Sequence, residues 1–190
     1  MASRMSGADR RAQILAIAAE EFAAFGLHGA STESIAQSAG ITQAYIFRIF
    51  GTKKALFLEL VRAAFTRVSE GMTAAAGETT GLAGLSEMGA QYYDLLADRT
   101  GLLLQLQGLA ACGDPEVRET LRECFAQLWD TVDHGTGLEP VTVKTFLAYG
   151  MLLNAGAALD VNDIDAPWAD GVRTRIRPGL FAHITTETNR

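Results

Sequence analysis

Apolar residues recur along this chain at helical spacing, and no segment of any length alternates with the period of a strand. A first amphipathic helix is predicted over 9–26, where Ile14 and Phe22 fall on the same side. A long helix is predicted to open at Thr52 and to end before the glycine-rich stretch 77–84, whose composition is that of a loop. The pattern therefore predicts an all-α fold.

The remainder of the chain predicts further helices. They are expected at about 85–97, 101–111, 116–132 and 140–159, with a short one over 168–175. The segment 101–111 is apolar nearly all round, which is typical of a helix buried in a core. Asp114-Pro115-Glu116 is a strong helix start, with a capping aspartate, a proline at the first position and an acid in the first turn. Residues 133–137 are expected to form a turn.

Two short helices joined by a glycine are predicted between the first helix and the long one. Ser31 or Thr32 is expected to cap a helix that ends at Gly40, because glycine adopts the left-handed conformation without a Cβ penalty. Thr42 is expected to cap the next helix, which Gly51 ends. Such a pair is a helix-turn-helix, and its second helix enters the major groove of DNA.

Two cations follow at the start of the long helix, at Lys53 and Lys54. A cation in the first turn of a helix opposes the helix macrodipole. A nearby DNA phosphate would compensate for this, and a solvated surface pair is the alternative. With the helix-turn-helix directly before them, we favour the phosphate contact for Lys53.

Three runs of spaced residues within about 8–58 match a known pattern. They are Arg10-Arg11-x-x-Ile14-Leu15-x-x-Ala18-x-x-x-Phe22-x-x-x-Gly26, Thr32-x-x-x-Ile35-Ala36-x-x-Ala39-Gly40-Ile41-Thr42 and Phe47-x-x-Phe50-Gly51-Thr52-Lys53-x-Ala55-Leu56. In this order they resemble the signature of the TetR family of bacterial transcriptional regulators. The remaining two-thirds of the chain carries no motif.

The domain boundary is expected within the long helix or just before it, since the head needs the first turns of that helix. This gives a helix-turn-helix DNA-binding domain over 1–55 and a helical domain over 56–190, which the resemblance implies binds a ligand and dimerises. The resemblance also implies that certain residues lie on or beside the recognition helix, namely Thr42, Gln43, Ala44, Tyr45, Phe47 and Arg48. Thr32 and Lys53 resemble the family's phosphate contacts.

The recognition helix offers several side chains that suit the major groove. Gln43 and Tyr45 are candidates to read base edges, since glutamine pairs well with adenine and apolar surface meets the thymine methyl group. Packing against a neighbouring helix is the alternative for Tyr45. For Arg48, a phosphate and a guanine edge both remain open.

Two positions depart from the family pattern. Phe47 stands where the family usually has tyrosine, and Ile49 stands where histidine or tyrosine is common. The missing hydroxyl at Phe47 should weaken backbone anchoring by about one hydrogen bond, roughly 0.5–1.5 kcal/mol. More of the binding is then left to Arg48, Lys53 and the N-terminal arginines.

The net charge of −6 is unusual for a DNA-binding protein, but its distribution is uneven. Residues 1–70 hold eight Lys/Arg and six Asp/Glu, whereas residues 71–190 hold eight and sixteen. Only the N-terminal part is positive, at +2 against −8 for the rest. Charge alone should therefore give a modest, salt-sensitive affinity for DNA.

By the same resemblance, the body of the protein binds a small-molecule effector. Aromatic and polar residues on its apolar helices suit a pocket of this kind, namely Tyr92, Gln107, Phe125, Trp129, Met151 and Asn154. Each of them also suits an ordinary core, which we favour for any single residue. Gln107 and Asn154 stand out because a buried amide needs a partner, which a dimer interface would also supply.

A homodimer is expected to form through the helices at 116–132 and 140–159. Small residues that would allow close helix approach are Ala148, Gly150, Ala155, Gly156 and Ala158. Packing within one subunit is the alternative. A two-fold dimer predicts a palindromic operator, with recognition helices about 34–36 Å apart.

These observations predict a ligand-responsive repressor that binds a double-stranded DNA operator as a dimer. The alternative is a helical small-molecule sensor or adaptor whose DNA head no longer binds specifically. We expect no enzyme, cofactor or metal site, since no HExxH, phosphate loop or G-x-S-x-G is present and Cys112 and Cys124 lack a CxxC or histidine partner. No apolar run approaches ~18 residues and no signal peptide is seen, so a cytoplasmic protein without a membrane segment is expected.

Overall fold

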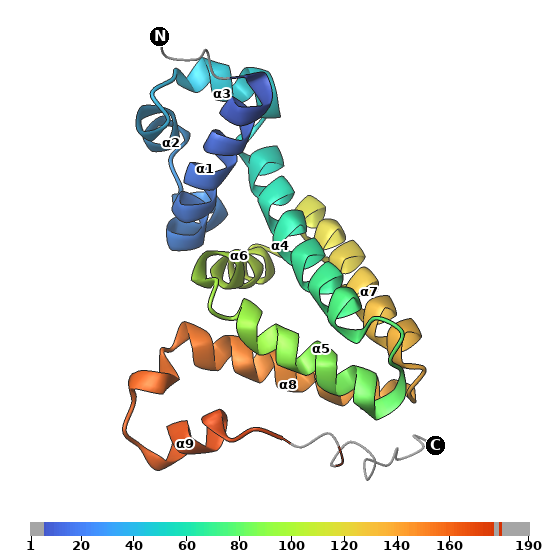
Figure 1. The fold of residues 1–190 in the computed structure, drawn as a ribbon. Coiled ribbons are helices and arrows are strands. Elements are labelled where there is room, and N and C mark those ends of the chain that lie inside the picture. Colours follow the sequence, from blue (N-terminus) through green and yellow to red (C-terminus); the bar gives the residue numbers. More distant parts are fainter. Residues whose placement is uncertain (1–5, 177–178, 180–190) are drawn as a thin grey trace. The chain divides into compact units, whose positions relative to one another are not determined.

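The computed structural model describes residues 6–176 and 179, and all regular structure within them is helical (Figure 1). The prediction of an all-α fold is confirmed. The chain forms two compact units. The first holds the chain up to Ala64 together with Thr100–Arg122, and the second holds Phe65–Arg99 and the chain from Glu123. Within the described ranges, no helix is long and apolar enough to cross a membrane.

The first unit contains the predicted helix-turn-helix. Its helices are α1 (Gly7–Gly29), α2 (Thr32–Ser38), α3 (Gln43–Phe50), the first half of α4 (Lys53–Ala76), most of α6 (Arg99–Ala110) and the start of α7 (Pro115–Thr136). The predicted spans of these helices agree with the structure to within a few residues, except at the end of α7.

Side-chain caps fix the starts of the two short helices. The Oγ of Ser31 accepts from the amide of Ser34 at 3.2 Å, so Ser31 and not Thr32 caps α2. The Oγ1 of Thr42 accepts from the amide of Tyr45 at 3.3 Å, as the sequence predicts. Each cap satisfies a backbone N–H that the helix itself leaves without a partner.

The turn between α2 and α3 requires a glycine. Gly40 has φ +65°, in the left-handed region. Its amide donates to the carbonyl of Gln37 at 3.1 Å, and the amide of Ile41 donates to that of Ala36 at 3.0 Å. This pair of bonds closes the helix end in a Schellman motif and sets the direction in which α3 leaves.

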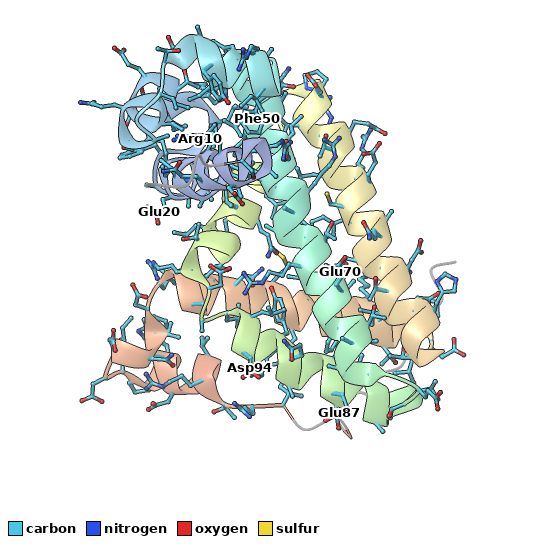
Figure 2. The ribbon with its side chains drawn as sticks, turned by 45° about the horizontal axis from the view of Figure 1, so that its top comes forward. Arg10, Glu20, Phe50, Glu70, Glu87 and Asp94 are labelled. Atoms are coloured by element: carbon cyan, nitrogen blue, oxygen red, sulfur yellow. The ribbon has the colours of Figure 1, made fainter. Side chains whose placement is uncertain are left out.

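An apolar core holds the helices of the first unit together. Its fully buried side chains include Ile14, Phe22, Ile35, Ile46, Phe57, Val61 and Val117. The rings of Phe22 on α1 and Phe57 on α4 lie 5.2 Å apart between centroids. Figure 2 marks Phe50, the last residue of α3, which is also buried. Helix α3 is thus held in this unit by its apolar side, which carries Ile46 and Phe50.

Helix α1 breaks near its end, at the predicted Gly26. This residue has φ +65° and ψ −177°, and a Cβ added to it would lie 2.5 Å from the Oε1 of Gln107. The Nε2 of Gln107 donates to the carbonyl of Ala23 at 3.3 Å. Gln107, a candidate ligand contact by sequence, therefore lies on α6 in the first unit and covers the break in α1.

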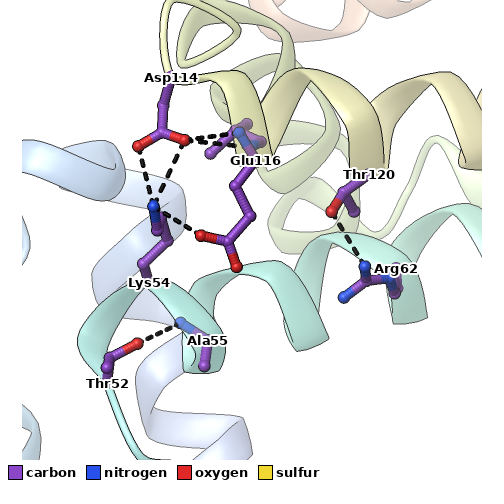
Figure 3. A network of polar contacts seen from close by, with 8 residues as sticks. Thr52, Lys54, Ala55, Arg62, Asp114, Glu116 and Thr120 are labelled. Atoms are coloured by element: carbon purple, nitrogen blue, oxygen red, sulfur yellow. Dashed lines mark hydrogen bonds and ion pairs between the residues drawn. The ribbon is translucent and has the colours of Figure 1, made fainter.

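A polar network joins α4 to α7 within the first unit (Figure 3). The Nζ of Lys54 lies 3.1 Å from an Asp114 carboxylate oxygen and 2.6 Å from one of Glu116. Asp114 also caps α7 by accepting from the amide of Glu116 at 2.9 Å, as the sequence predicts. One turn further along α7, the Oγ1 of Thr120 accepts from the Nη2 of Arg62 at 3.0 Å.

The second unit is built from α5 (Gly81–Leu95), α8 (Pro140–Ala158), the short 3₁₀ helix η1 (Val161–Asp163), α9 (Pro167–Arg173) and the remaining parts of α4 and α7. Its fully buried side chains include Leu85, Met88, Val132 and Val143. The helices at 140–159 and 168–175 are confirmed, whereas η1 was not predicted. Neither Cys112 nor Cys124 forms a disulfide.

Two predicted breaks, 77–84 and 133–137, are shorter in the structure, where only 77–80 and 137 lie outside helices. Residues 81–84 belong to α5, and 133–136 belong to α7. A Cβ on Gly84 would lie 2.4 Å from the carbonyl oxygen of Thr79, and one on Gly135 would lie 2.7 Å from the Cε of Met88. A glycine can therefore lie inside a helix where a neighbour comes this close.

The helix at 101–111 is less enclosed than its composition suggests. Leu102 and Leu104 are buried, but Leu103, Leu106 and Leu109 are only half-buried. The expectation of burial all round is wrong, because α6 contributes only part of its circumference to the core of its unit.

Replacing Gly26 with alanine should destabilise the first unit by about 1–3 kcal/mol, since alanine is strained at a positive φ and its Cβ would meet Gln107. The urea midpoint, followed by circular dichroism, measures this. Gly113→Ala is the matched control, because a Cβ there meets nothing within 4 Å. Equal midpoints for the two variants would contradict the strain at Gly26.

Replacing Asp114 with asparagine should remove a pH-dependent part of the stability while retaining the helix cap. The hydrogen bond from Lys54 is the main cause that lowers the pKa of Asp114 from 3.8. A lowered pKa gives stability that is present above the ordinary value and lost as pH falls through the folded-state value. The Tm of Asp114→Asn should therefore lie below that of the wild type at neutral pH and converge with it in acid. Asp130→Asn, an exposed change on the same helix, should show no such convergence.

Candidate nucleic-acid interface

The two sides of α3 differ in chemistry. Ile46 is fully buried and Phe50 nearly so, which fixes the inner side. The exposed side carries four of the residues predicted to meet DNA, namely Gln43, Ala44, Phe47 and Arg48. Their spacing of one, four and five positions places them together on one face of the helix. The solvent-exposed face of α3 therefore carries both polar and apolar side chains, while the opposite face is buried.

Arg48 and Tyr45 lie against each other on α3. The guanidinium carbon of Arg48 is 4.6 Å from the centroid of the Tyr45 ring. Tyr45 itself is half-buried, and its ring is partly covered by this cation. The contact holds the positive charge of Arg48 close to the exposed face of the helix.

Thr32 and Gln43 join α2 to α3. The Nε2 of Gln43 donates to the Oγ1 of Thr32 at 2.6 Å. Thr32 is only 6 % exposed, whereas Gln43 is exposed. A direct phosphate contact by Thr32 stays a prediction, and the hydroxyl's partner in this structure is the glutamine.

Lys53 and Lys54 differ in their surroundings although they are adjacent. The Nζ of Lys53 donates to the carbonyl oxygens of His28 at 3.3 Å and Ala30 at 3.1 Å. An ammonium group has three N–H donors, so one is left for a further acceptor such as a phosphate. Lys54 instead is paired with two carboxylates, which cancel its charge.

The N-terminal arginines also differ in whether a carboxylate pairs with them. Arg11 pairs with Glu59 at 2.7 Å and lies 4.9 Å from the centroid of the Phe50 ring. Arg10, labelled in Figure 2, donates to the carbonyl of Ala39 at 3.3 Å. Among the described residues of the first unit, no carboxylate pairs with Arg10, Arg48 or Lys53. Each of these three cations therefore keeps an uncompensated positive charge.

Three of the candidate ligand residues come together in the second unit. The hydroxyl of Tyr92 on α5 donates to the Oδ1 of Asn154 on α8, whose Nδ2 lies 4.0 Å from the Sδ of Met151. Burial raises the pKa of Tyr92 to about 12, so the hydroxyl stays protonated and donates. Phe125 packs on Phe65 instead, with ring centroids 5.5 Å apart.

A pair of tyrosines lies on the same two helices as this cluster. The hydroxyls of Tyr93 on α5 and Tyr149 on α8 are 2.6 Å apart, and the guanidinium of Arg175 lies 4.5 Å from the Tyr93 ring centroid. Burial first, and then the bond to Tyr149, raise the pKa of Tyr93 to about 12. Only the packing of α5 against α8, which run in the same direction, brings these residues together, and nothing in the local sequence predicts it.

The segment that builds this interface matches a known family. Residues 14–60 match the family described as bacterial regulatory proteins, tetR family. This match spans most of α1, all of α2 and α3, and the first turns of α4. Over 65 residues it is 35 % identical to the uncharacterised HTH-type transcriptional regulator YdgC of Bacillus subtilis (strain 168). The match covers 34 % of this chain and about a third of that protein's length.

Solved structures of TetR-like regulators share the fold over most of this chain. The transcriptional regulator FadR from Bacillus subtilis, in complex with stearoyl-CoA, has a TM-score of 0.69 at 17 % identity and covers 91 % of this chain and 98 % of its own. The TetR family regulator PfmR from Thermus thermophilus has a TM-score of 0.65 at 17 % identity, with 84 % and 92 % covered. The predicted architecture, a helix-turn-helix head followed by a helical body, is confirmed.

Proposed function

We propose that this protein is a ligand-responsive transcriptional repressor of the TetR family that binds a palindromic DNA operator as a homodimer. The exposed face of α3 carries the proposal, because it presents groove-reading side chains on a capped helix whose other side is buried. The DNA-binding domain is assigned to 1–55 and the ligand-binding and dimerisation domain to 56–190. Such a role needs no catalysis, and it places the protein in the cytoplasm with the DNA.

Charge supports phosphate binding by the same unit. Arg48 lies on the exposed face of α3, and Lys53 follows three residues after that helix ends. Both keep their positive charge uncompensated by carboxylates, as does Arg10. A small number of such contacts gives an affinity that falls with salt, but less steeply than in strongly basic proteins. Thr42, at the start of α3, is exposed and completes the assigned contact set.

We assign the effector to the second unit, near Tyr92, Met151 and Asn154. These side chains combine apolar surface with a few polar groups, as small-molecule sites do. The related FadR structure was solved with stearoyl-CoA. That supports a small-molecule effector for this chain without naming it. Trp129 is half-buried and remains a further candidate contact.

The dimer surface is assigned to α8. An exposed apolar stripe runs along it at helical spacing, made of Ala148, Met151, Leu152, Ala155 and Leu159. The side chain of Leu159 is 62 % exposed. A contiguous exposed apolar surface of this kind is typical of a protein–protein interface. Gly156, which the sequence places among the small residues of the dimer interface, is instead buried within the subunit against Val161 and Val172. A second copy of the chain meeting stripe to stripe would bury this surface.

The alternative is a helical sensor or adaptor whose head does not bind DNA specifically. Phe47 favours it, since this 39 % exposed side chain has no hydroxyl for a phosphate. The two functions differ in one measurable property, which is the selection of a DNA sequence.

Purified protein should select a palindromic site from random duplex DNA, and its affinity for that site should fall as salt rises. Arg48→Ala or Tyr45→Ala should lower the affinity by at least about ten-fold without unfolding the protein, because each removes a major-groove or phosphate contact. Arg122→Ala, an exposed change on α7, is the matched control. An absence of any selected sequence at low salt would favour the adaptor.

Replacing Leu152 with glutamate should convert the dimer to a monomer, because a charge would be buried at the centre of the apolar stripe. Sedimentation velocity measures the change directly, and operator affinity should fall with it. Ala63→Glu introduces the same charge on an exposed position of α4, outside the expected dimer helices, and should leave the dimer intact. A Leu152→Glu dimer of unchanged stability would place the interface elsewhere.

A further inference from the structure

The bond between Gln43 and Thr32 is not required for helix capping. Ser31 caps α2 and Thr42 caps α3, so the hydroxyl of Thr32 is left for another partner. That partner is the Nε2 of Gln43, 2.6 Å away. Both residues open their helices, and the bond therefore spans the turn of the helix-turn-helix.

The two ends of this bond differ in rigidity. Thr32 is 6 % exposed and β-branched, which restricts its side chain to few rotamers. Its neighbour Ser31 is held too, because the backbone amide donates to the Oε1 of Glu21 at 2.8 Å. Gln43 is exposed and has a long side chain that would otherwise sample many rotamers. The hydroxyl thus acts as a fixed anchor for a flexible group.

We propose that Thr32 is a positioning residue that holds the Gln43 amide in the orientation in which it reads one base pair of the operator. This assignment rests on the proposed function. A glutamine amide has one acceptor oxygen and two N–H donors. With one N–H given to Thr32, the Oε1 and the second N–H remain, and this pair matches the N6 amino donor and N7 acceptor of adenine. Holding the amide before DNA arrives reduces the ordering cost of binding.

Positioning differs measurably from the direct phosphate contact that the family resemblance implies for Thr32. A phosphate contact strengthens binding to every sequence about equally, because it carries no base information. A hydroxyl that orients Gln43 changes the preference at one base-pair position only. The base-preference profile therefore separates the two roles.

The test compares wild type, Thr32→Val and Thr32→Ser on all single-base-pair variants of the selected operator. The wild type should discriminate roughly ten- to a hundred-fold at the base pair that Gln43→Ala identifies by losing that preference. Thr32→Val should lower this discrimination by about two- to ten-fold, as expected for one lost hydrogen bond, and leave the other positions unchanged. Thr32→Ser, which retains the hydroxyl, should keep the profile.

Two controls exclude a merely structural effect. Ser31→Ala removes the cap of α2 and should lower affinity equally for all sequences. In a Gln43→Ala background, Thr32→Val should have no further effect on any base preference, since the group it positions is gone. In the free wild-type protein, side-chain amide relaxation measured by NMR should show Gln43 as rigid, a readout that needs no variant to fold.

Several results would overturn the assignment. They are a uniform loss of affinity in Thr32→Val, an unchanged or sharper profile, an additional effect in the Gln43→Ala background, the absence of any position read by Gln43, or a mobile Gln43 amide in the free protein. A wild-type protein that selects no DNA sequence would overturn the proposed function itself. The role of Thr32 is thus judged only after the regulator assignment has passed its own test.

Discussion

The burial of Ile46 and Phe50 is the constraint on which the interface depends. Helix α3 has eight residues, whereas isolated helices shorter than about 12–15 residues are marginal in water. Its helical state and its orientation therefore come from contact with the core and from its end caps, Thr42 and Gly51. Because those contacts fix the inner side of the helix, they also decide which residues face outward. The packing of Ile46 and Phe50 thus determines which side chains of α3 are free to contact DNA.

In the same unit, the positions of the unpaired cations matter more than the net charge. Little local positive charge would remain on its surface if every cation were paired with a carboxylate, as Lys54 and Arg11 are. Lys53 is instead held by backbone carbonyls and Arg48 by an aromatic ring. Both partners attract the cation without cancelling its formal charge. A chain of net charge −6 can in this way present localised positive charge, while its acidic remainder discourages non-specific association with DNA.

Much of the first unit is predictable from sequence because its signals are local. Caps at Thr42 and Asp114, the left-handed Gly40 and the break at Gly26 each follow from residue types a few positions apart. The failures involve packing that residue types alone do not reveal. Gly84 and Gly135 have the composition of helix breaks, but in the structure Gly84 leaves room for the carbonyl of Thr79 just before the helix, and Gly135 leaves room for the distant Met88.

In the candidate site, too, some features follow from the local sequence and others depend on contacts between helices. The exposed face of α3 follows from helical spacing, since Ile46 and Phe50 fix the opposite side. The pairing of Gln43 with Thr32 does not, because either Ser31 or Thr32 is a competent cap by sequence. In the second unit, Tyr92 and Asn154 are 62 positions apart, and their bond exists only because α5 and α8 pack together. An amide within an apolar helix predicts that a partner is needed, but gives no indication of which residue supplies it.

The boundary of the first compact unit differs from the boundary of the helix-turn-helix motif. The motif ends near the start of α4, yet the unit that holds it also contains most of α6 and the first turns of α7. Lys54 explains part of this, because it follows α3 by four residues and is bound to the start of α7. Gln107 explains another part, since it covers the break in α1. Helices α4 and α7 each supply residues to both units, so the boundary between the units falls within these helices and not at the end of the motif.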